Sequence, residues 1–132
     1  MRRLGRWLFY WLPPAAWAAA IFGLSSLSSL PRPPAYPGED KVLHALFFAI
    51  LALWLLRALT GERRIRLGKA AALAFLAASL YGAFDEVHQY FVPPRTMDAA
   101  DWLADSLGAA VVFVVAVVAA RVSRAGGEEG PL

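Results

Sequence analysis

Between Leu80 and Val112 the chain concentrates side chains that can do acid and base chemistry. Half of its 10 acidic residues and one of its 2 histidines lie in this stretch: Asp85, Glu86, Asp98, Asp101, Asp105 and His88. Neighbouring carboxyl groups can divide into one protonated and one ionised group, which supplies a general acid and a general base together. Apolar segments flank the stretch on both sides, so we interpret it as a site and not as a linker.

Helical spacing would bring these side chains together in two sets. The first set stands at positions i, i+3 and i+4 and consists of Asp85, His88 and Gln89. The second stands at i, i+3 and i+7 and consists of Asp98, Asp101 and Asp105. Each set falls on one face of a helix. His44, from an earlier apolar segment, can complete a ring of polar groups, and Arg95 can hold an anionic headgroup or phosphate.

The candidate site residues fall into two groups by their chemistry. The candidate catalytic residues are Asp85, Glu86, Asp101 and His44. The candidate substrate-binding residues are Arg95, Gln89, Lys41, Asp40, Asp105 and His88. Purely structural roles stay open for several of them. Asp40 and Asp98 can be helix N-caps, and Lys41 can snorkel to the membrane surface. His44 can be a hydrogen-bonded packing residue, Glu86 and His88 can face headgroup water, and Arg95 can simply neutralise the acids.

A metal-assisted site is a further alternative. The chain has no cysteine, which excludes a disulfide and a thiolate metal site. A metal would need His44, His88 and nearby carboxylates as ligands. The sequence lacks the spacing of known zinc motifs, so we expect neither a metal nor a cofactor.

The composition indicates which solvent surrounds these groups. Of the 132 residues, 59% are hydrophobic, which exceeds what a soluble domain of this size normally buries. The sequence pI near 9.7 reflects short basic blocks between apolar runs, a pattern of membrane topology and not of nucleic-acid binding. We therefore expect an integral membrane protein with no nucleic-acid partner.

Four apolar segments predict an all-α, four-helix transmembrane bundle. The expected helices run from Trp7 to Leu24, from Lys41 to Leu59 with Gly61 as the stop, from Ala70 to about Phe91, and from Asp98 to Val122. Pro13 and Pro14 fall near the start of the first, which we take as an uncleaved span and not a signal peptide. Asp40 is the expected N-cap of the second. Prolines predict an extended external loop over 31–39. One domain should span 1–124, and a polar cytoplasmic tail 125–132.

The basic residues predict the orientation of the four helices. On one side lie ten of the 13 Lys and Arg residues: Arg2, Arg3, Arg6, Arg57, Arg63, Arg64, Arg66, Lys69, Arg121 and Arg124. By the positive-inside rule both termini are cytoplasmic. Seven of the 10 acids and both histidines then fall on the extracytoplasmic side. This predicts a multi-pass membrane protein whose site faces away from the cytoplasm.

The depth of the polar residues supports a functional role. From Ala70 to Phe84 the third segment covers only about 22 Å before Asp85, and from Ser106 to Ala120 the fourth covers the same length. A hydrocarbon core of about 30 Å is thicker than that. A charged side chain there costs about 2.5–3.5 kcal/mol when it faces lipid. The acids must therefore face one another, a basic group or water.

The residues resemble a known family. Asp40, Lys41, His44 and Phe48 fit the signature Asp-Lys-x-x-His-x-x-x-Phe of the VanZ-like family of small bacterial membrane proteins. A second signature is matched by Asp85, Glu86, Gln89, Phe91, Pro93, Arg95, Asp101, Asp105 and Gly108. The Ser-Ser-Leu-Ser-Ser-Leu-Pro stretch also resembles the family pattern. The chain departs from it at Asp105, where Asn is common, and at Val112, where Gly is common. The first departure adds a titratable group.

The resemblance implies a bacterial cell-envelope protein that spans the cytoplasmic (inner) membrane several times, with its site on the extracytoplasmic side. The family is named for a member linked to resistance to the glycopeptide antibiotic teicoplanin, which suggests the same antibiotic-resistance role here. We expect the outward site to bind or modify a membrane lipid or lipid-linked envelope precursor. A non-catalytic binder that assembles with a second copy or a membrane partner protein stays open. A small proton- or ion-coupled transporter is a third alternative, although 45–56 and 111–120 contain no polar residue to continue a pathway.

Overall fold

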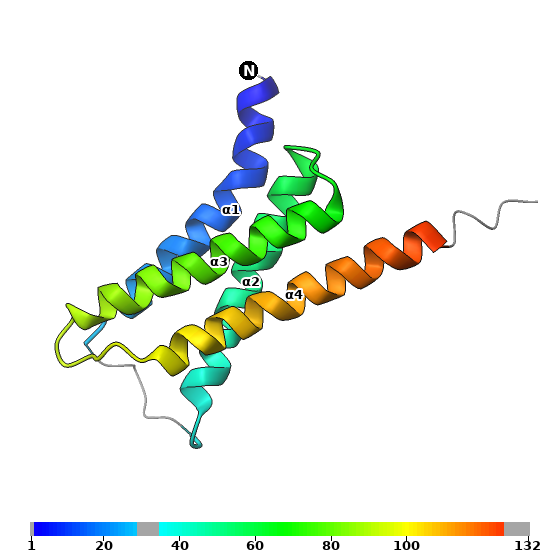
Figure 1. Cartoon of the computed structure of the whole chain (residues 1–132). Coiled ribbons are helices and arrows are strands. Elements are labelled where there is room, and N and C mark those ends of the chain that lie inside the picture. The colour runs from blue at the N-terminus through cyan, green and yellow to red at the C-terminus, as the bar shows by residue number, and fades with distance from the viewer. Residues whose placement is uncertain (1, 29–34, 126–132) are drawn as a thin grey trace, which may run out of the picture.

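The protein is a bundle of four helices in the computed structural model, which describes residues 2–28 and 35–125 (Figure 1). The helices are α1 (Arg2–Ser25), α2 (Glu39–Gly61), α3 (Leu67–Tyr90) and α4 (Ala99–Ala125). Each is long and apolar enough to cross a membrane, and the described residues contain no strand. The all-α, four-helix prediction is confirmed. Part of the predicted external loop, 31–34, and most of the predicted tail, 126–132, lie outside the described residues.

The helix ends test the predicted capping residues. The predicted N-cap Asp40 is wrong: α2 begins at Glu39 after Gly38, whose φ of 84° is open to glycine because it lacks a Cβ. Asp98 is the N-cap of α4, because its Oδ1 accepts a 2.8 Å hydrogen bond from the Ala100 N–H. Gly61 ends α2 as predicted.

Pro13 and Pro14 lie inside α1 and not near its start, because the helix already begins at Arg2. Proline has no N–H, so the carbonyl of Phe9, four residues before Pro13, loses its helical donor. The Arg57 guanidinium of α2 supplies a replacement at 3.1 Å from that oxygen. Its carbon also lies 4.3 Å from the centre of the Phe9 ring. Figure 1 shows that α1 changes direction along its length, as helices do at proline.

Small residues set the distances between the helices. The buried face of α3 includes Ala70, Ala71, Ala74, Ala78 and Gly82. On α4, a Cβ at Gly108 would collide with the backbone carbonyl of Ala45, so α2 and α4 approach closely there. Lipid gives no hydrophobic drive to helix association, and close van der Waals packing through small residues replaces it.

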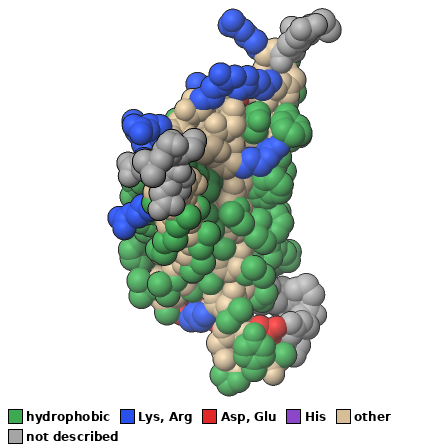
Figure 2. Space-filling model, turned by 90° about the vertical axis from the view of Figure 1, so that its right-hand side faces the viewer, with side chains coloured by type: hydrophobic (Ala, Val, Ile, Leu, Met, Phe, Trp, Pro, Cys, Tyr) green, Lys and Arg blue, Asp and Glu red, His purple; other side chains and the backbone are tan. Residues whose placement is uncertain are grey.

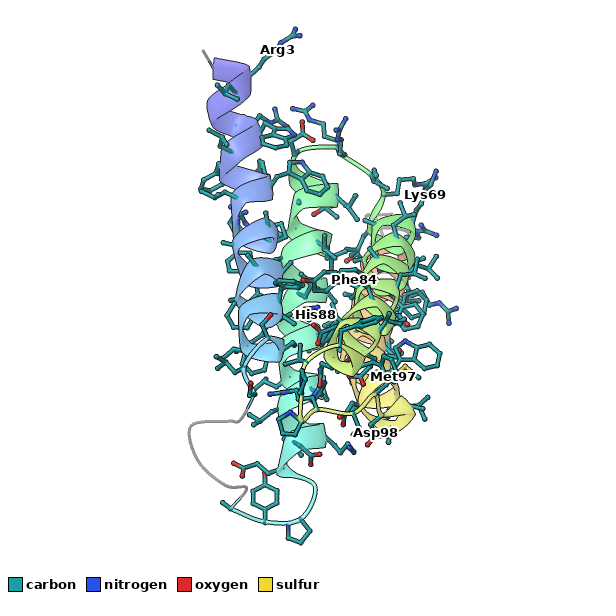
Figure 3. The ribbon with its side chains drawn as sticks, turned by 90° about the vertical axis from the view of Figure 1, so that its left-hand side faces the viewer. Arg3, Lys69, Phe84, His88, Met97 and Asp98 are labelled. Atoms are coloured by element: carbon teal, nitrogen blue, oxygen red, sulfur yellow. The ribbon has the colours of Figure 1, made fainter. Side chains whose placement is uncertain are left out.

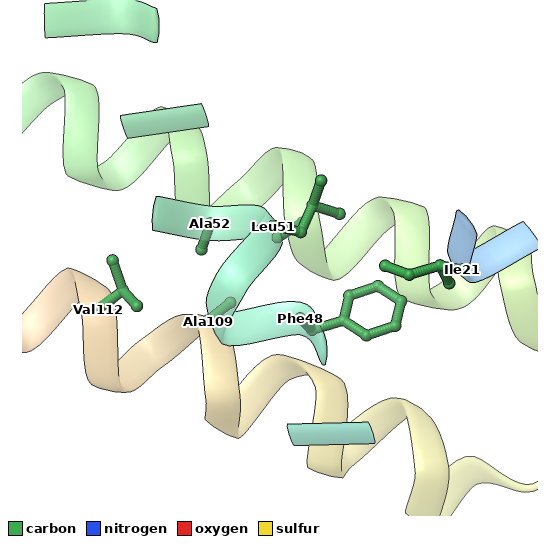
Figure 4. Packing of buried hydrophobic residues seen from close by; sticks show 7 residues of the cluster. Ile21, Phe48, Leu51, Ala52, Ala109 and Val112 are labelled. Atoms are coloured by element: carbon green, nitrogen blue, oxygen red, sulfur yellow. The ribbon is translucent and has the colours of Figure 1, made fainter. Parts of the chain in front are cut away.

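The apolar core lies in the middle of the bundle (Figure 4). It consists of Ile21, Phe48, Leu51, Ala52, Ala78, Ala109 and Val112. All four helices contribute, although α1 packs mainly on α2 and over a shorter stretch on α3. Val112 is buried in this core, so the valine that stands in place of the family's common glycine is a packing residue.

The two ends of the bundle differ in charge. Lys and Arg side chains gather toward one end of the face in Figure 2, and hydrophobic side chains cover most of its length. Arg3 and Lys69 lie at one end of the bundle and Asp98 at the other (Figure 3). The polar stretch therefore sits at the end opposite the basic one.

Candidate functional site

Charged groups meet where α2 begins, α3 ends and α4 begins. We call the set around Lys41 and His44 the polar cluster: Asp40, Lys41, His44, Glu86, Asp98, Asp101 and Asp105. Three helices and the loop before α4 contribute to it. The first and last of these residues, Asp40 and Asp105, are 65 positions apart in the sequence (105 − 40), and only the fold brings the whole set together.

Lys41 is the cationic centre of the exposed part of the cluster. Its Nζ lies 3.1 Å from Asp40, 2.8 Å from Asp98 and 2.5 Å from Asp101. The Lys41 ammonium lowers the pKa of the Asp98 carboxyl below its usual value, and the hydrogen bond from the Ala100 N–H lowers it further. Lys41 therefore positions Asp101 as well as neutralising charge.

His44 lies deeper and joins α2 to α4. Its Nδ1 lies 2.9 Å from Oδ1 of Asp105, and a carboxylate oxygen can only accept, so Nδ1–H is the donor in this pair. The other ring nitrogen, Nε2, lies 3.8 Å from Oδ2 of Asp101, which is too long for a hydrogen bond. With Nδ1 as the donor, Nε2 carries the free lone pair. The arrangement presents this nitrogen to the neighbouring carboxylates.

Glu86 reaches the cluster from α3 and is only 3% exposed. Its Oε2 accepts a 2.9 Å hydrogen bond from the backbone N–H of Asp98. Its Oε1 has only a 3.4 Å contact with the side-chain nitrogen of Gln89. One carboxylate oxygen of Glu86 is thus held by the backbone, and the other is weakly engaged.

A second set, the Asp85 group, consists of Ser25, Asp85, Gln89 and Arg95. The Ser25 hydroxyl donates to Oδ2 of Asp85 at 2.6 Å, and the Gln89 amide donates to the same oxygen at 3.1 Å. Arg95 donates to Oε1 of Gln89 at 3.0 Å and to the Leu27 carbonyl at 2.9 Å. Among the described residues Arg95 forms no ion pair with a carboxylate. Gln89 links the group to Glu86.

Two buried carboxylate oxygens lack a hydrogen-bond partner in the described part of the chain. They are Oδ1 of Asp85 and Oδ2 of Asp105, on side chains that are 1% and 0% exposed. An unpaired buried polar atom costs about 1–3 kcal/mol. Neither Lys41 nor Arg95 is paired with these two carboxyl groups. The site therefore carries more acid than its own basic groups neutralise.

His88 lies apart from both sets, although its spacing predicted a shared face with Asp85 and Gln89. Its ring stacks on Phe22 of α1 with centres 4.2 Å apart, and its Nε2 lies 3.0 Å from the Ser26 hydroxyl. Asp85 and Gln89 are buried while His88 is only half-buried. Among the described residues no acid pairs with His88.

Sequence reasoning missed the role of three small residues. Ser25 is a buried donor to Asp85, and its only signal was its place in the Ser-rich end of an apolar helix. Gly82 leaves room for Asp105, whose Oδ2 would lie 2.8 Å from a Cβ there. Gly108 stands one turn beyond Asp105 and admits the backbone of Ala45, next to His44. The glycines let α2, α3 and α4 come close enough for the polar side chains to meet.

One trio of residues has the donor set of a cation site. One ligand atom each from His44, Glu86 and Asp101 lies within 4.8 Å of the other two. The same trio can serve proton transfer, because Nε2 of His44 is a base beside two carboxyl groups.

A comparison with known protein families identifies the family of the chain. Neither the curated proteins nor the solved structures include a match to the chain. A family comparison matches VanZ/LLP1 over residues 7–120, which covers all four helices and every residue of the polar cluster. Because the match extends over most of the 132 residues, the chain belongs to the VanZ/LLP1 family of membrane proteins.

Proposed function

We propose that this protein binds a lipid or lipid-linked envelope component at the polar cluster and acts on it by acid and base chemistry. The observation that carries the proposal is the fixed His44, whose Nδ1 is held by Asp105 while Nε2 faces Asp101. An imidazole oriented by a carboxylate is a general base with a defined tautomer. Asp101 and Glu86 are the carboxyl groups that can supply or accept the second proton.

The exposure of the cluster supports access by a ligand at the membrane surface. Side-chain exposure falls from 46% at Asp98 and 34% at Lys41 to 19% at His44 and 0% at Asp105. The cationic Lys41 therefore stands at the exposed side, and the base stands beneath it. A negatively charged headgroup would meet Lys41 before it reaches His44.

Arg95 is the second candidate contact for an anionic group. Its Nε and Nη1 are used by Leu27 and Gln89, which leaves Nη2 without an acceptor in the described part of the chain. Gln89 fixes the guanidinium through one hydrogen bond and contacts Asp85 and Glu86 through its amide nitrogen. A phosphate bound by Arg95 would thus lie beside the acids of the site.

The orientation belongs to the same proposal. Four spans return the chain to its starting side. Basic residues gather toward one end of the bundle (Figure 2), and Asp98 lies at the end opposite Arg3 and Lys69 (Figure 3). The positive-inside rule puts that basic end in the cytoplasm of a bacterial cell. The polar cluster then faces the extracytoplasmic side of the cytoplasmic membrane, where envelope precursors are used.

A non-catalytic binder is the alternative, in which the site holds a lipid headgroup, a glycopeptide or a partner protein. The partly exposed Lys41 and Arg95 favour this alternative, because they can bind an anionic group without any proton transfer. Either activity at the envelope could contribute to glycopeptide resistance, teicoplanin included. Asp101→Asn and Gln89→Glu separate the two: an enzyme loses turnover and keeps its ligand, while a binder changes only in affinity.

Native mass spectrometry of the gently solubilised protein tests the proposal. We expect a co-purified lipid or lipid-linked precursor on the wild type and its loss from Lys41→Met and His44→Ala variants. Lys69→Met, at the other end of the bundle, is the matched control and should retain the ligand. Equal lipid retention by all four proteins, or none by any, would remove the polar cluster as the binding site.

A further inference from the structure

We propose that His44, Glu86 and Asp101 bind a divalent first-row transition metal ion such as Mn²⁺ or Zn²⁺. The three residues come from α2, α3 and α4, so the ion would join three helices. The proposal goes beyond lipid binding, and only the role of the ion toward a lipid rests on the proposed function. Nε2 of His44 cannot act as a base while it binds the ion, so acid and base chemistry with the ion bound would rest on the carboxyl groups and on water held by the ion.

The distances suit such an ion. The three ligand atoms lie within 4.8 Å of one another. Nitrogen and oxygen ligands stand about 2.0–2.2 Å from a divalent zinc ion, which places neighbouring ligand atoms about 3–4 Å apart. Side-chain movements of about 1 Å, well within rotamer freedom, would close the site.

Each of the three side chains is held at one atom by a hydrogen bond. Asp105 holds Nδ1 of His44, Lys41 holds Oδ1 of Asp101, and the Asp98 N–H holds Oε2 of Glu86. Of the other atoms, Nε2 of His44 and Oδ2 of Asp101 accept no hydrogen bond in the described part of the chain, and Oε1 of Glu86 accepts only the 3.4 Å hydrogen bond from Gln89. Metal-bound histidines characteristically donate their other ring nitrogen to a carboxylate, as His44 does to Asp105.

Buried negative charge is the second, independent observation. Asp105 is fully buried with Oδ2 unpaired, and Glu86 is 3% exposed with no basic partner among the described residues. Lys41 neutralises the exposed acids and does not reach Asp105 or Glu86. At membrane depth a carboxyl group must be either protonated or balanced by a cation. A divalent cation between His44, Glu86 and Asp101 supplies that balance for Glu86.

The donor set selects the class of ion. One imidazole nitrogen and two carboxylate oxygens suit Mn²⁺, Zn²⁺ or Fe²⁺, and the absence of cysteine disfavours soft ions. Three protein ligands leave coordination positions for water or for a phosphate oxygen of a lipid. The spacing of known zinc motifs could not reveal this trio, because Glu86 follows His44 by 42 residues and Asp101 follows Glu86 by 15.

The test uses the full chain in detergent, stripped with EDTA and titrated with Mn²⁺ or Zn²⁺ in the absence of added lipid. We expect one Mn²⁺ per chain, with ¹⁴N coupling from the imidazole in the electron paramagnetic resonance spectrum. Glu86→Gln should weaken Mn²⁺ binding at least about 100-fold, since loss of an outer partner alone typically costs 10- to 100-fold. Asp101→Asn is the second ligand variant if Glu86→Gln does not fold, as judged by circular dichroism.

Glu62→Gln is the matched control, because Glu62 lies outside the polar cluster, in the loop after α2, where it pairs with Arg63. Its Mn²⁺ affinity should stay within about 2-fold of wild type, since charges that far away are screened. Failure to bind either ion, Mn²⁺ binding without ¹⁴N coupling, or equal weakening in Glu62→Gln and Glu86→Gln would each overturn the metal site. Lipid retention by the EDTA-stripped protein is scored separately, so the lipid proposal can stand when the metal proposal fails, and the reverse.

Discussion

Nδ1 of His44 on α2 lies 2.9 Å from Oδ1 of Asp105 on α4, and this hydrogen bond crosses the closest approach of the two helices. One turn further along α4, Gly108 faces the backbone carbonyl of Ala45, the residue after His44. Because Gly108 has no side chain, α2 and α4 can come close enough for the hydrogen bond to form. Without the close approach, His44 and Asp105 would be too far apart to share a proton.

Asp105 should set the tautomer of His44. In wild type we expect the Nδ1–H form, which ¹⁵N chemical shifts of labelled histidine distinguish from the Nε2–H form. Asp105→Asn keeps an acceptor oxygen for Nδ1–H and should keep this form, which fits the asparagine that the family commonly has here. Asp105→Leu removes the acceptor and should give a mixture. His88 is the internal control, and an unchanged His44 signal in Asp105→Leu would contradict the assignment.

Gly108→Ala should destabilise the bundle by about 1–3 kcal/mol, because the added Cβ meets backbone atoms of Ala45 that no side-chain rotation can move. Unfolding in detergent measures the change. Gly23→Ala is the matched control, since nothing lies within 4 Å of that position. It should be neutral or stabilise α1 by up to about 1 kcal/mol. Equal effects of the two substitutions would show that α2 and α4 are not in close contact.

Ser25→Ala should destabilise the protein by about 1–3 kcal/mol, because the buried Asp85 loses its 2.6 Å donor. Gln89 then remains as the donor to Oδ2 of Asp85. Hydrogen exchange should increase at the C-terminal end of α1, which Ser25 anchors to α3. Ser123→Ala is the control, since that exposed hydroxyl bonds only a carbonyl of its own helix. No difference between the two variants would remove Ser25 as an anchor.

The Lys41–Asp98 pair should make stability depend on pH in the acid range. Since the pKa of Asp98 is lowered from 3.8 in the folded chain, the pair stabilises the fold above that pH. The contribution disappears as the pH falls through the lowered pKa. In Lys41→Met the ¹³C titration of the Asp98 carboxyl should move up toward 3.8, while Lys69→Met should leave it unchanged. A lowered midpoint that persists in Lys41→Met would assign the shift to the helix cap alone.

Because the chain has no cysteine, single cysteines report the orientation directly. A membrane-impermeant maleimide should label Met97→Cys in intact cells and should label Lys69→Cys only after the membrane is opened. Met97 is exposed at the end that carries Asp98, and Lys69 lies at the basic end (Figure 3). The reverse labelling pattern would place the polar cluster in the cytoplasm and exclude an outward site.

The four helices could be predicted from the sequence because each helix as a whole is long and apolar enough to cross a membrane, although charged residues occupy one end of α2, α3 and α4. The error at Asp40 has a local cause, since Asp is a common N-cap but glycine at a positive φ starts the helix two residues earlier. The prolines of α1 were misplaced because Arg57, far along the chain, compensates the free Phe9 carbonyl. Such compensation belongs to tertiary structure and leaves no local signal.

The polar cluster was predictable in membership but not in pairing. Helical spacing predicted that Asp98, Asp101 and Asp105 share a face, and Lys41 and His44 contact that face. It also grouped His88 with Asp85 and Gln89, whereas the ring of Phe22 holds His88 against α1. Spacing within one helix tells which residues share a face of that helix. It does not tell which neighbouring helix covers each part of that face.

The alanine and glycine face of α3 reverses the usual rules of substitution. In a water-soluble bundle, truncation of large core residues does the most damage. Here the helices associate through close packing of small residues. A larger side chain at Ala70, Ala74, Ala78 or Gly82 is therefore the harmful change. Evolutionary drift on this face should be confined to glycine, alanine and serine, while the lipid-facing leucines and valines can exchange freely. The positions restricted to small residues then mark the contacts that keep the acids of α3 and α4 within reach of His44.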